Sequence, residues 1–225
     1  MRELADAAHG VGAQLVAVVE PTSLAMLAPP GAYGADIVAA EGQPLGIPLS
    51  YGGPYLGLMA ASMASVRQMP GRLVGATRDA GGRKGYVLTL QAREQHIRRE
   101  KAASNICTNQ ALCALAATAY LTAVGPNGLR EVAELSTIQA RHLAGGLESA
   151  GLGERRFSAP YFAEVAVRIP EAPRRHAELA QRGIVAGYPL WRDYPELADT
   201  LLLAATELTT DDDVAALIAA LKETR

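Results

Sequence analysis

A short, unbroken apolar run, QLVAVV at residues 14–19, leaves few folds open to this chain. Such a run is typical of a strand that is buried on both faces, as in parallel sheets covered by helices. Residues 2–13 carry apolar side chains at helical spacing before it, and strand candidates follow at 36–39 and 55–60. Strands that alternate with helices predict an α/β layer architecture.

The remaining elements follow from turn residues and periodicity. Asp79-Ala80-Gly81-Gly82 separates two strand-like stretches and predicts a β-hairpin. We expect helices at 23–27 and 62–69, hairpin strands at 73–77 and 85–90, a mostly helical stretch at 104–148 broken at 126–128, strands at 164–169, 184–186 and 201–205, and helices at 174–182 and 211–222. The glycines at 151–153 predict a boundary between residues 1–150 and 151–225.

Composition excludes several classes of protein. A chain of 225 residues with 49% hydrophobic residues can form a sizeable core. Its formal net charge of −2 gives no support for nucleic-acid binding. Its longest apolar run, residues 112–124, is shorter than a membrane span and is followed by Gly125-Pro126. We therefore expect neither a nucleic-acid partner nor a membrane partner.

Metal and disulfide chemistry find little support in the sequence. Cys107 and Cys113 are six residues apart on an expected helix, so they do not share a face. The acidic run Asp211-Asp212-Asp213 follows Thr210 and fits a helix N-terminus with a capping box better than a metal site. We expect no metal ligands and a reduced, cytoplasmic setting.

The Gly- and Pro-rich stretch EGQPLGIPLSYGGPYLG, residues 41–57, reads from its composition as a surface loop after a buried strand. It also resembles the loop that carries the cofactor lysine in fold-type-I pyridoxal-phosphate (PLP) enzymes. The nearest similarity is to the glycine cleavage system P-protein family. Matching Pro48 and Pro54 to the family's prolines places Gln43 at the lysine position. An amide cannot form a Schiff base, so the resemblance is to the PLP-free subunit, subunit 1.

The same resemblance extends over nearly the whole chain. It is carried further by residues 69–112, 125–135 and 183–221. The family has an Asp that pairs with the pyridine nitrogen of PLP, and here Ala17 stands in its place, with Glu20 nearby. The resemblance implies that residues 1–150 are the later part of a PLP-transferase-like large domain and 151–225 a small α/β domain. Because the family's chain continues upstream of Met1, we expect an incomplete sheet, and a chain that by itself is poorly stable or self-associated.

The function that the resemblance implies is subunit 1 of a glycine decarboxylase. With subunit 2, in a heterotetramer, it would remove the glycine carboxyl and pass the aminomethyl group to the lipoyl arm of H-protein. PLP would be held by subunit 2. An independent PLP enzyme is disfavoured by Gln43 and Ala17. A non-catalytic fragment that only binds a partner is the alternative.

A dense polar segment supplies the candidate site residues. They are Arg93, His96, Arg98, Arg99, Lys101 and Asn105, with Glu94, Glu100 and Ser104 among them. One interpretation is a solvated helix face on which Glu94 and Arg98 pair at i,i+4. The other is a positively charged wall that faces the partner subunit, the active-site channel or the carrier protein, since arginine binds carboxylates with a planar fork. Both interpretations remain open on the sequence.

Overall fold

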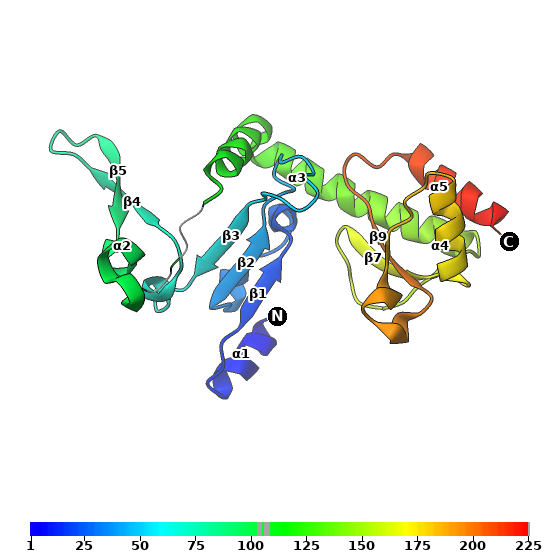
Figure 1. The fold of residues 1–225 in the computed structure, drawn as a ribbon, viewed down its shortest axis with the longest axis horizontal. Helices are drawn as coiled ribbons and strands as arrows, with labels where there is room; N and C mark the ends of the chain where they lie inside the picture. Colours follow the sequence, from blue (N-terminus) through cyan, green and yellow to red (C-terminus); the bar gives the residue numbers. More distant parts are fainter. Residues whose placement is uncertain (103–104, 106–108, 225) are drawn as a thin grey trace. The chain divides into compact units, whose positions relative to one another are not determined.

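The computed structural model describes residues 1–102, 105 and 109–224. The chain divides into two compact units, Met1–Ala123 and Val124–Arg225. The first unit contains a three-stranded and a two-stranded sheet and the second a four-stranded sheet, and each unit can be followed by colour along the ribbon in Figure 1. Ser104 and Cys107, named above, lie outside the described residues.

The first unit contains a three-stranded sheet in the order β1-β2-β3. The expected apolar strand is β1 (Val16–Val19), which runs parallel to β2 (Ile37–Glu41). The third strand, β3 (Gly57–Ala61), is antiparallel to β2. The expected N-terminal helix is α1 (Arg2–Gly10), and it ends earlier than predicted, before a turn in which Gly12 has φ +74°. Two 3-10 helices lie between β1 and β2: η1 (Pro21–Ala25) and η2 (Pro30–Tyr33).

Residues 62–101 leave this sheet and form a hairpin with short helices on either side. The helix expected at 62–69 is wrong in extent, because only η3 (Val66–Gln68) is helical, ahead of Pro70-Gly71. The hairpin is confirmed as β4 (Leu73–Arg78) and β5 (Lys84–Thr89), and the Asp79 carboxylate accepts the N–H groups of Gly81 and Arg83 in its turn. Beyond it lie η4 (Gln91–Arg93), α2 (Gln95–Arg98) and η5 (Arg99–Lys101).

Helix α3 (Ala111–Ser149) is long and apolar enough by length and composition to cross a membrane. Gly125 has φ 62° and ψ −175°, so α3 consists of two helices joined at a kink. The part before the kink, residues 111–124, rises about 21 Å at 1.5 Å per residue, which is short of the roughly 30 Å hydrocarbon core of a bilayer. The expected break at 126–128 is thus present one residue earlier, at Gly125.

The second unit is built on a four-stranded antiparallel sheet in the order β6-β7-β9-β8. Its strands are β6 (Glu154–Arg155), β7 (Glu164–Arg168), β8 (Tyr188–Pro189) and β9 (Thr200–Ala204). Its helices are α4 (Ala172–Gln181), η6 (Leu190–Arg192), η7 (Pro195–Leu197) and α5 (Asp211–Glu223), besides the later part of α3. The core packs Leu143 and Leu147 of α3 with Val167, Leu179 and Leu201.

Two details of this unit differ from the sequence prediction. The strand expected at 184–186 is wrong, because pairing with β9 begins only at Tyr188. Gly187, with φ +89°, precedes it and approaches so closely that a Cβ there would lie 2.5 Å from the Leu202 carbonyl oxygen. The two-residue strand β6 was too short to predict. The capping box at α5 is confirmed, with Thr210 and Asp213 bonding to each other's backbone N–H groups.

Candidate functional site

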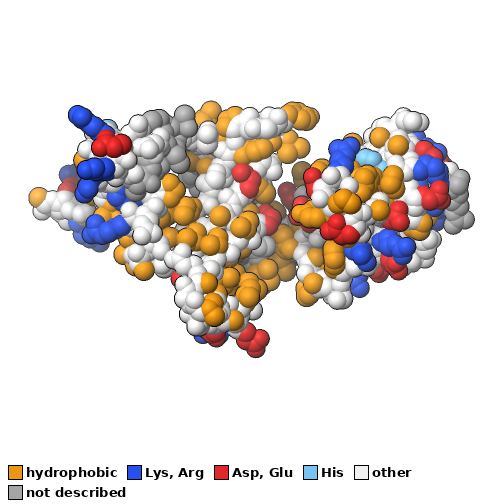
Figure 2. Space-filling model, turned by 60° about the horizontal axis from the view of Figure 1, so that its bottom comes forward, with side chains coloured by type: hydrophobic (Ala, Val, Ile, Leu, Met, Phe, Trp, Pro, Cys, Tyr) orange, Lys and Arg blue, Asp and Glu red, His pale blue; other side chains and the backbone are white. Residues whose placement is uncertain are grey.

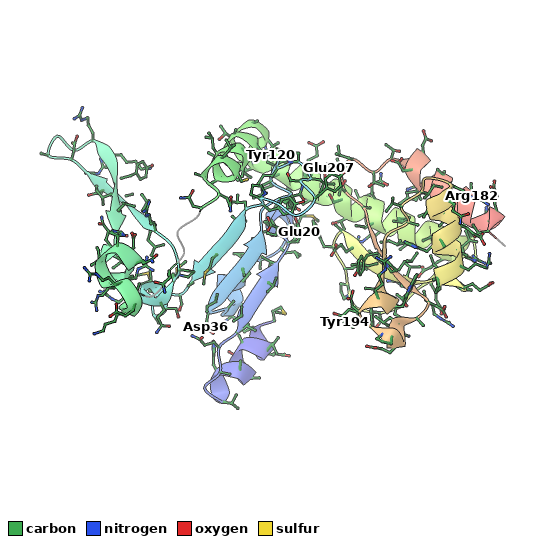
Figure 3. The ribbon with its side chains drawn as sticks, viewed as in Figure 1. Glu20, Asp36, Tyr120, Arg182, Tyr194 and Glu207 are labelled. Atoms are coloured by element: carbon green, nitrogen blue, oxygen red, sulfur yellow. The ribbon has the colours of Figure 1, made fainter. Side chains whose placement is uncertain are left out.

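The edge of the first sheet at the carboxyl ends of β1 and β2 is the place where the resemblance expects a cofactor. Because these strands are parallel, the residues that follow them meet at one edge. Figure 3 shows Glu20 at this end of β1, whereas Asp36 lies at the opposite end, before β2. Ala17 is buried within β1, with 7% of its surface exposed. Its methyl group offers no partner to a pyridine nitrogen.

Glu20 does not replace the missing carboxylate, because it is used locally. Its Oε2 accepts a hydrogen bond from the Thr22 hydroxyl at 2.6 Å and from the Ser23 N–H at 2.8 Å. The Ser23 hydroxyl in turn donates to the Glu20 carbonyl oxygen. Glu20 is therefore the N-cap of η1.

Gln43 lies two residues beyond the end of β2 and is held within its own turn. Its side-chain Nε2 donates to the Ile47 carbonyl oxygen at 2.6 Å. The backbone closes the same turn, since the N–H of Leu45 donates to the Gly42 carbonyl and the N–H of Ile47 to that of Gln43. Leu45 and Ile47 are both buried, each 6% exposed. The Gln43 amide, at the position where the resemblance expects a lysine, thus stabilises a packed turn.

Glu41 ties the two ends of the 41–57 loop together. Its Oε1 accepts the backbone N–H of Gln43 at 3.0 Å and that of Leu56 at 2.9 Å. The Gly42 N–H donates to the Leu56 carbonyl at 2.6 Å, where an added Cβ at Gly42 would lie 3.0 Å from that oxygen. The loop is therefore anchored at its base.

These residues do not fit covalent attachment of PLP. A Schiff base needs a deprotonated amine, and position 43 supplies an amide that already donates to a carbonyl. The lysines of the sequence are Lys84, Lys101 and Lys222, and all three are exposed and lie outside the loop. The nitrogen partner is also absent at Ala17. At this edge the described residues therefore include neither the amine nor the carboxylate that the resemblance expects to hold PLP.

In the polar segment, Arg93 is a structural residue. Its guanidinium donates to the carbonyl oxygens of Met69, of Gly71 at 3.0 Å and of Leu90 at 3.2 Å. These bonds connect the stretch before β4 with the stretch after β5. Arg93 is therefore committed to holding the base of the hairpin and is not a free anion-binding group.

Glu94 and His96 form a second local cluster. The Glu94 side chain is 12% exposed, and its Oε2 lies 3.6 Å from Arg72 Nε and 3.3 Å from His96 Nδ1. Its Oε1 is buried and has no hydrogen-bond partner among the described residues. The expected Glu94–Arg98 side-chain pair is replaced by these contacts, and the Arg98 Nε donates to the Ala92 carbonyl instead.

The remaining members of the segment face solvent. Arg98, Arg99, Lys101 and Asn105 are all exposed, and Arg99 has φ +52° where α2 passes into η5. The structure therefore separates the expected site residues into a tied arginine, Arg93, and an exposed basic group made of Arg98, Arg99 and Lys101. We refer to the latter three as the basic group.

The positive charge extends further than the sequence prediction placed it. Residues 67–101 contain nine Lys and Arg against three Asp and Glu, in a chain whose formal net charge is −2. Lys and Arg side chains gather at the end of the first unit where Figure 1 shows β4, β5 and α2 (Figure 2). The sequence prediction of the charged site left out Arg67, Arg72, Arg78, Arg83 and Lys84, although a count of charges along the sequence reveals them.

The comparisons with known proteins concern nearly the whole chain. A family model described as glycine cleavage system P-protein matches residues 1–221. Proteins named probable glycine dehydrogenase (decarboxylating) subunit 1 are similar: that of Moorella thermoacetica is 50% identical over 223 residues, and that of Methylococcus capsulatus 53% over 224. The alignments cover 99% and 98% of this chain but 50% and 49% of those relatives. The chain thus spans about half the length of the curated relatives it matches.

Solved structures agree with the sequence matches. A crystal structure described as glycine decarboxylase (P-protein) of the glycine cleavage system, in inhibitor-bound form, has a TM-score of 0.91 and 48% identity, covering 100% of this chain and 51% of that one. Mouse CSAD in apo form, at 16% identity, gives 0.68 and covers 98% and 47%. A NifS-like protein from Rickettsia africae, at 14% identity, gives 0.65 and covers 99% and 56%. The fold is that of the fold-type-I PLP-dependent transferases.

Proposed function

Because the chain belongs to the glycine cleavage system P-protein family, we propose that it acts as subunit 1 of a glycine-decarboxylating enzyme and does not itself attach the cofactor. The observation that carries this proposal is Gln43. The chain keeps the loop of the cofactor site, but the side chain at the lysine position is an amide bonded to the Ile47 carbonyl. The chemistry is therefore assigned to a partner.

The partner in this proposal is subunit 2, which holds PLP, and the two form a heterotetramer. PLP supplies an electron sink for decarboxylation of glycine. The aminomethyl group then passes to the lipoyl arm of H-protein. The word "subunit 1" in the relatives' names supports a partner subunit. The contribution of this chain is architectural: it orders the anchored 41–57 loop and presents a positively charged surface.

The domain organisation belongs to the same proposal. Residues 1–150 are proposed as part of the PLP-transferase-like large domain with its connecting helices, and residues 151–225 as the small α/β domain. The separate antiparallel sheet of the second unit supports a small domain at the C-terminal end. The core of that unit also includes Leu143 and Leu147 of α3, and the compact unit begins at Val124, before residue 151. A cytoplasmic location fits an enzyme subunit of this kind.

A second candidate is a module that binds the partner but leaves catalysis unchanged. The same observation favours it, since neither Gln43 nor Ala17 can contribute to cofactor chemistry. The two candidates differ in what happens to the partner's activity. Under our proposal, subunit 2 decarboxylates glycine only in complex with subunit 1. Under the alternative, subunit 2 has the same activity alone.

The experiment combines the subunit at its natural length with purified subunit 2 and PLP. Exchange of labelled bicarbonate into glycine is measured for each subunit and for the mixture. The complex is reduced with borohydride, and the PLP adduct is mapped by mass spectrometry. We expect exchange only in the mixture and an adduct only on subunit 2. An adduct on any lysine of subunit 1 would show that the assignment of the cofactor to the partner is wrong.

The role of the basic group can be tested in the same system. We propose that Arg98 and Arg99 contact a carboxylate of the partner, of the carrier surface or of the substrate. Loss of a desolvated charge-assisted contact costs on the order of 2–5 kcal/mol, whereas loss of a solvated arginine costs well under about 1 kcal/mol. Arg98→Ala and Arg99→Ala are compared with Arg130→Ala, an exposed arginine that pairs with Glu134 in α3.

The expected result is lower exchange activity or weaker subunit binding for Arg98→Ala or Arg99→Ala, with Arg130→Ala unchanged. Results for Arg93→Ala are interpreted separately from those for the basic group. This substitution removes the hydrogen bonds to the Met69, Gly71 and Leu90 carbonyls and so perturbs the base of the hairpin. If both variants of the basic group match the wild type in both assays, the segment is a solvated face.

A further inference from the structure

Gln43 supplies a hydrogen bond on which the 42–47 turn depends. Its Nε2 donates to the Ile47 carbonyl oxygen at 2.6 Å, and within the described residues no backbone N–H group donates to that oxygen. Ile47 is 6% exposed, and a buried acceptor that loses its donor destabilises the segment that holds it. Both groups belong to one turn, so this bond is the same whatever else in a longer subunit covers the loop.

The role of Gln43 in this turn requires a donor. Glutamate has nearly the size of glutamine, but as a carboxylate it only accepts hydrogen bonds. A lysine ammonium has three donors on a flexible stem, and this stem is one bond longer than that of glutamine. A lysine at position 43 is therefore long enough to donate to the Ile47 carbonyl in place of the amide, whereas a glutamate cannot.

The surroundings of the turn favour the protonated form of such an amine. The Glu41 carboxylate accepts the Gln43 N–H at 3.0 Å, and residues 3–66 contain five Asp and Glu but no Lys or Arg. A nearby carboxylate and an accepting carbonyl both stabilise an ammonium. A lysine becomes a nucleophile when an apolar pocket or a second cation removes its proton, and this turn offers neither.

The described residues also provide no second handle for the cofactor. Ala17 presents a methyl group, and the Glu20 carboxylate is bonded to Thr22 and Ser23. Building on the proposed function, we infer that Gln43 is a structural donor of the 42–47 turn, and that a lysine placed at this position serves as the same donor and does not take up PLP. Loss of the cofactor is then a property of the whole turn and not of one residue.

The first part of the test compares Gln43→Glu with Gln43→Lys in the subunit at its natural length. Circular dichroism first shows that each variant folds. Hydrogen exchange of the Leu45 and Ile47 amides is then measured at pH 7, where the new carboxylate is ionised. Gln43→Glu is expected to accelerate their exchange at least about 10-fold, because the Ile47 carbonyl loses its donor and faces a second acceptor. Gln43→Lys is expected to change it less than about 3-fold, because a donor is kept.

The second part measures uptake of the cofactor. Wild-type subunit 1, Gln43→Lys and purified subunit 2 are each incubated with one equivalent of PLP, reduced with borohydride and mapped by mass spectrometry. Subunit 2 is the positive control and is expected to be fully labelled at one lysine. In Gln43→Lys, position 43 is expected to be labelled no more than the exposed Lys222 of the same chain.

Three results would overturn the inference. The first is exchange in Gln43→Glu as slow as in the wild type, which would show that the turn needs no donor. The second is exchange in Gln43→Lys as fast as in Gln43→Glu, which would show that the amine does not act as the donor. The third is labelling of position 43 in Gln43→Lys to the level of subunit 2. A label on a lysine of the wild-type subunit instead overturns the proposed function, whereas the exchange rates decide the role of Gln43 by themselves.

Discussion

Substitution of Gly46 by alanine tests whether the 42–47 turn is packed against α3. Gly46 has φ +81°, and a Cβ built on it would lie 2.6 Å from the Cβ and Cγ atoms of Tyr120, which is labelled in Figure 3. A left-handed conformation costs an alanine roughly 1–2 kcal/mol, and overpacking adds about 1–3 kcal/mol. The expected loss is therefore about 2–5 kcal/mol in total.

The matched control is Gly12→Ala. Gly12 has a similar φ of +74°, but nothing lies within 4 Å of the added Cβ. It should show the strain alone, about 1–2 kcal/mol. The difference between the two substitutions then isolates the contact with Tyr120.

Hydrogen exchange of the backbone amides of Leu45 and Ile47 reports on the turn, since these N–H groups close it. Gly46→Ala should accelerate their exchange by roughly 30-fold or more, because 1.4 kcal/mol corresponds to a factor of ten. Gly12→Ala should leave these amides unchanged. Adding Tyr120→Gly, which removes the Tyr120 Cβ as well as its ring, should remove most of the excess relative to Tyr120→Gly alone, as a double-mutant cycle would report.

The reasoning is refuted if Gly46→Ala slows or preserves exchange at Leu45 and Ile47. It is also refuted if Gly46→Ala accelerates exchange as much in the Tyr120→Gly background as in the wild type. Either result would mean that the turn is not seated on the Tyr120 side chain.

Three further predictions follow from single contacts. Gln43→Leu should destabilise the 42–47 turn by about 1 kcal/mol, measured by exchange of the Ile47 amide, because the Ile47 carbonyl loses its Gln43 donor; unchanged exchange would contradict it. The hydrogen bond from the Thr210 hydroxyl, and then that from the Thr210 backbone, lower the pKa of Asp213 below its ordinary 3.8, so the cap stabilises α5 above about pH 4 and is lost as the pH falls through the lowered pKa; Asp213→Asn should remove this acid sensitivity from the unfolding curve, and a curve as acid-sensitive as wild type would disprove the link. The 225-residue chain expressed alone should self-associate, because Val16 and Val18 of β1 are 52% and 81% exposed; a monomer with a cooperative thermal transition in light scattering and calorimetry would show otherwise.

Short sequence patterns predicted the elements whose formation depends on neighbouring residues alone. The apolar run gave β1, the Asp79-Ala80-Gly81-Gly82 turn gave the hairpin, and Thr210 with Asp213 gave the start of α5. The strand expected at 184–186 failed because its register depends on how closely Gly187 approaches Leu202, a tertiary contact that periodicity does not report.

The candidate site, too, could be predicted from the sequence only in part. The amide at position 43 was visible in the sequence, and the resemblance gave its meaning. Only the structure shows that the Gln43 Nε2 donates to the Ile47 carbonyl. Only the structure distinguishes Arg93, which donates to three carbonyl oxygens, from the exposed Arg98. Side chains of one type and one segment have different roles because their backbone surroundings differ.

The way in which Glu41 anchors the 41–57 loop has a consequence for how such a subunit can evolve. Its carboxylate binds the backbone N–H groups of Gln43 and Leu56, and every residue except proline has such a group. The two hydrogen bonds of the Glu41 carboxylate therefore do not depend on which side chain stands at position 43. An amine or an amide at position 43 would leave these two hydrogen bonds in place, so the shape of the loop base and the chemistry of this side chain can change independently.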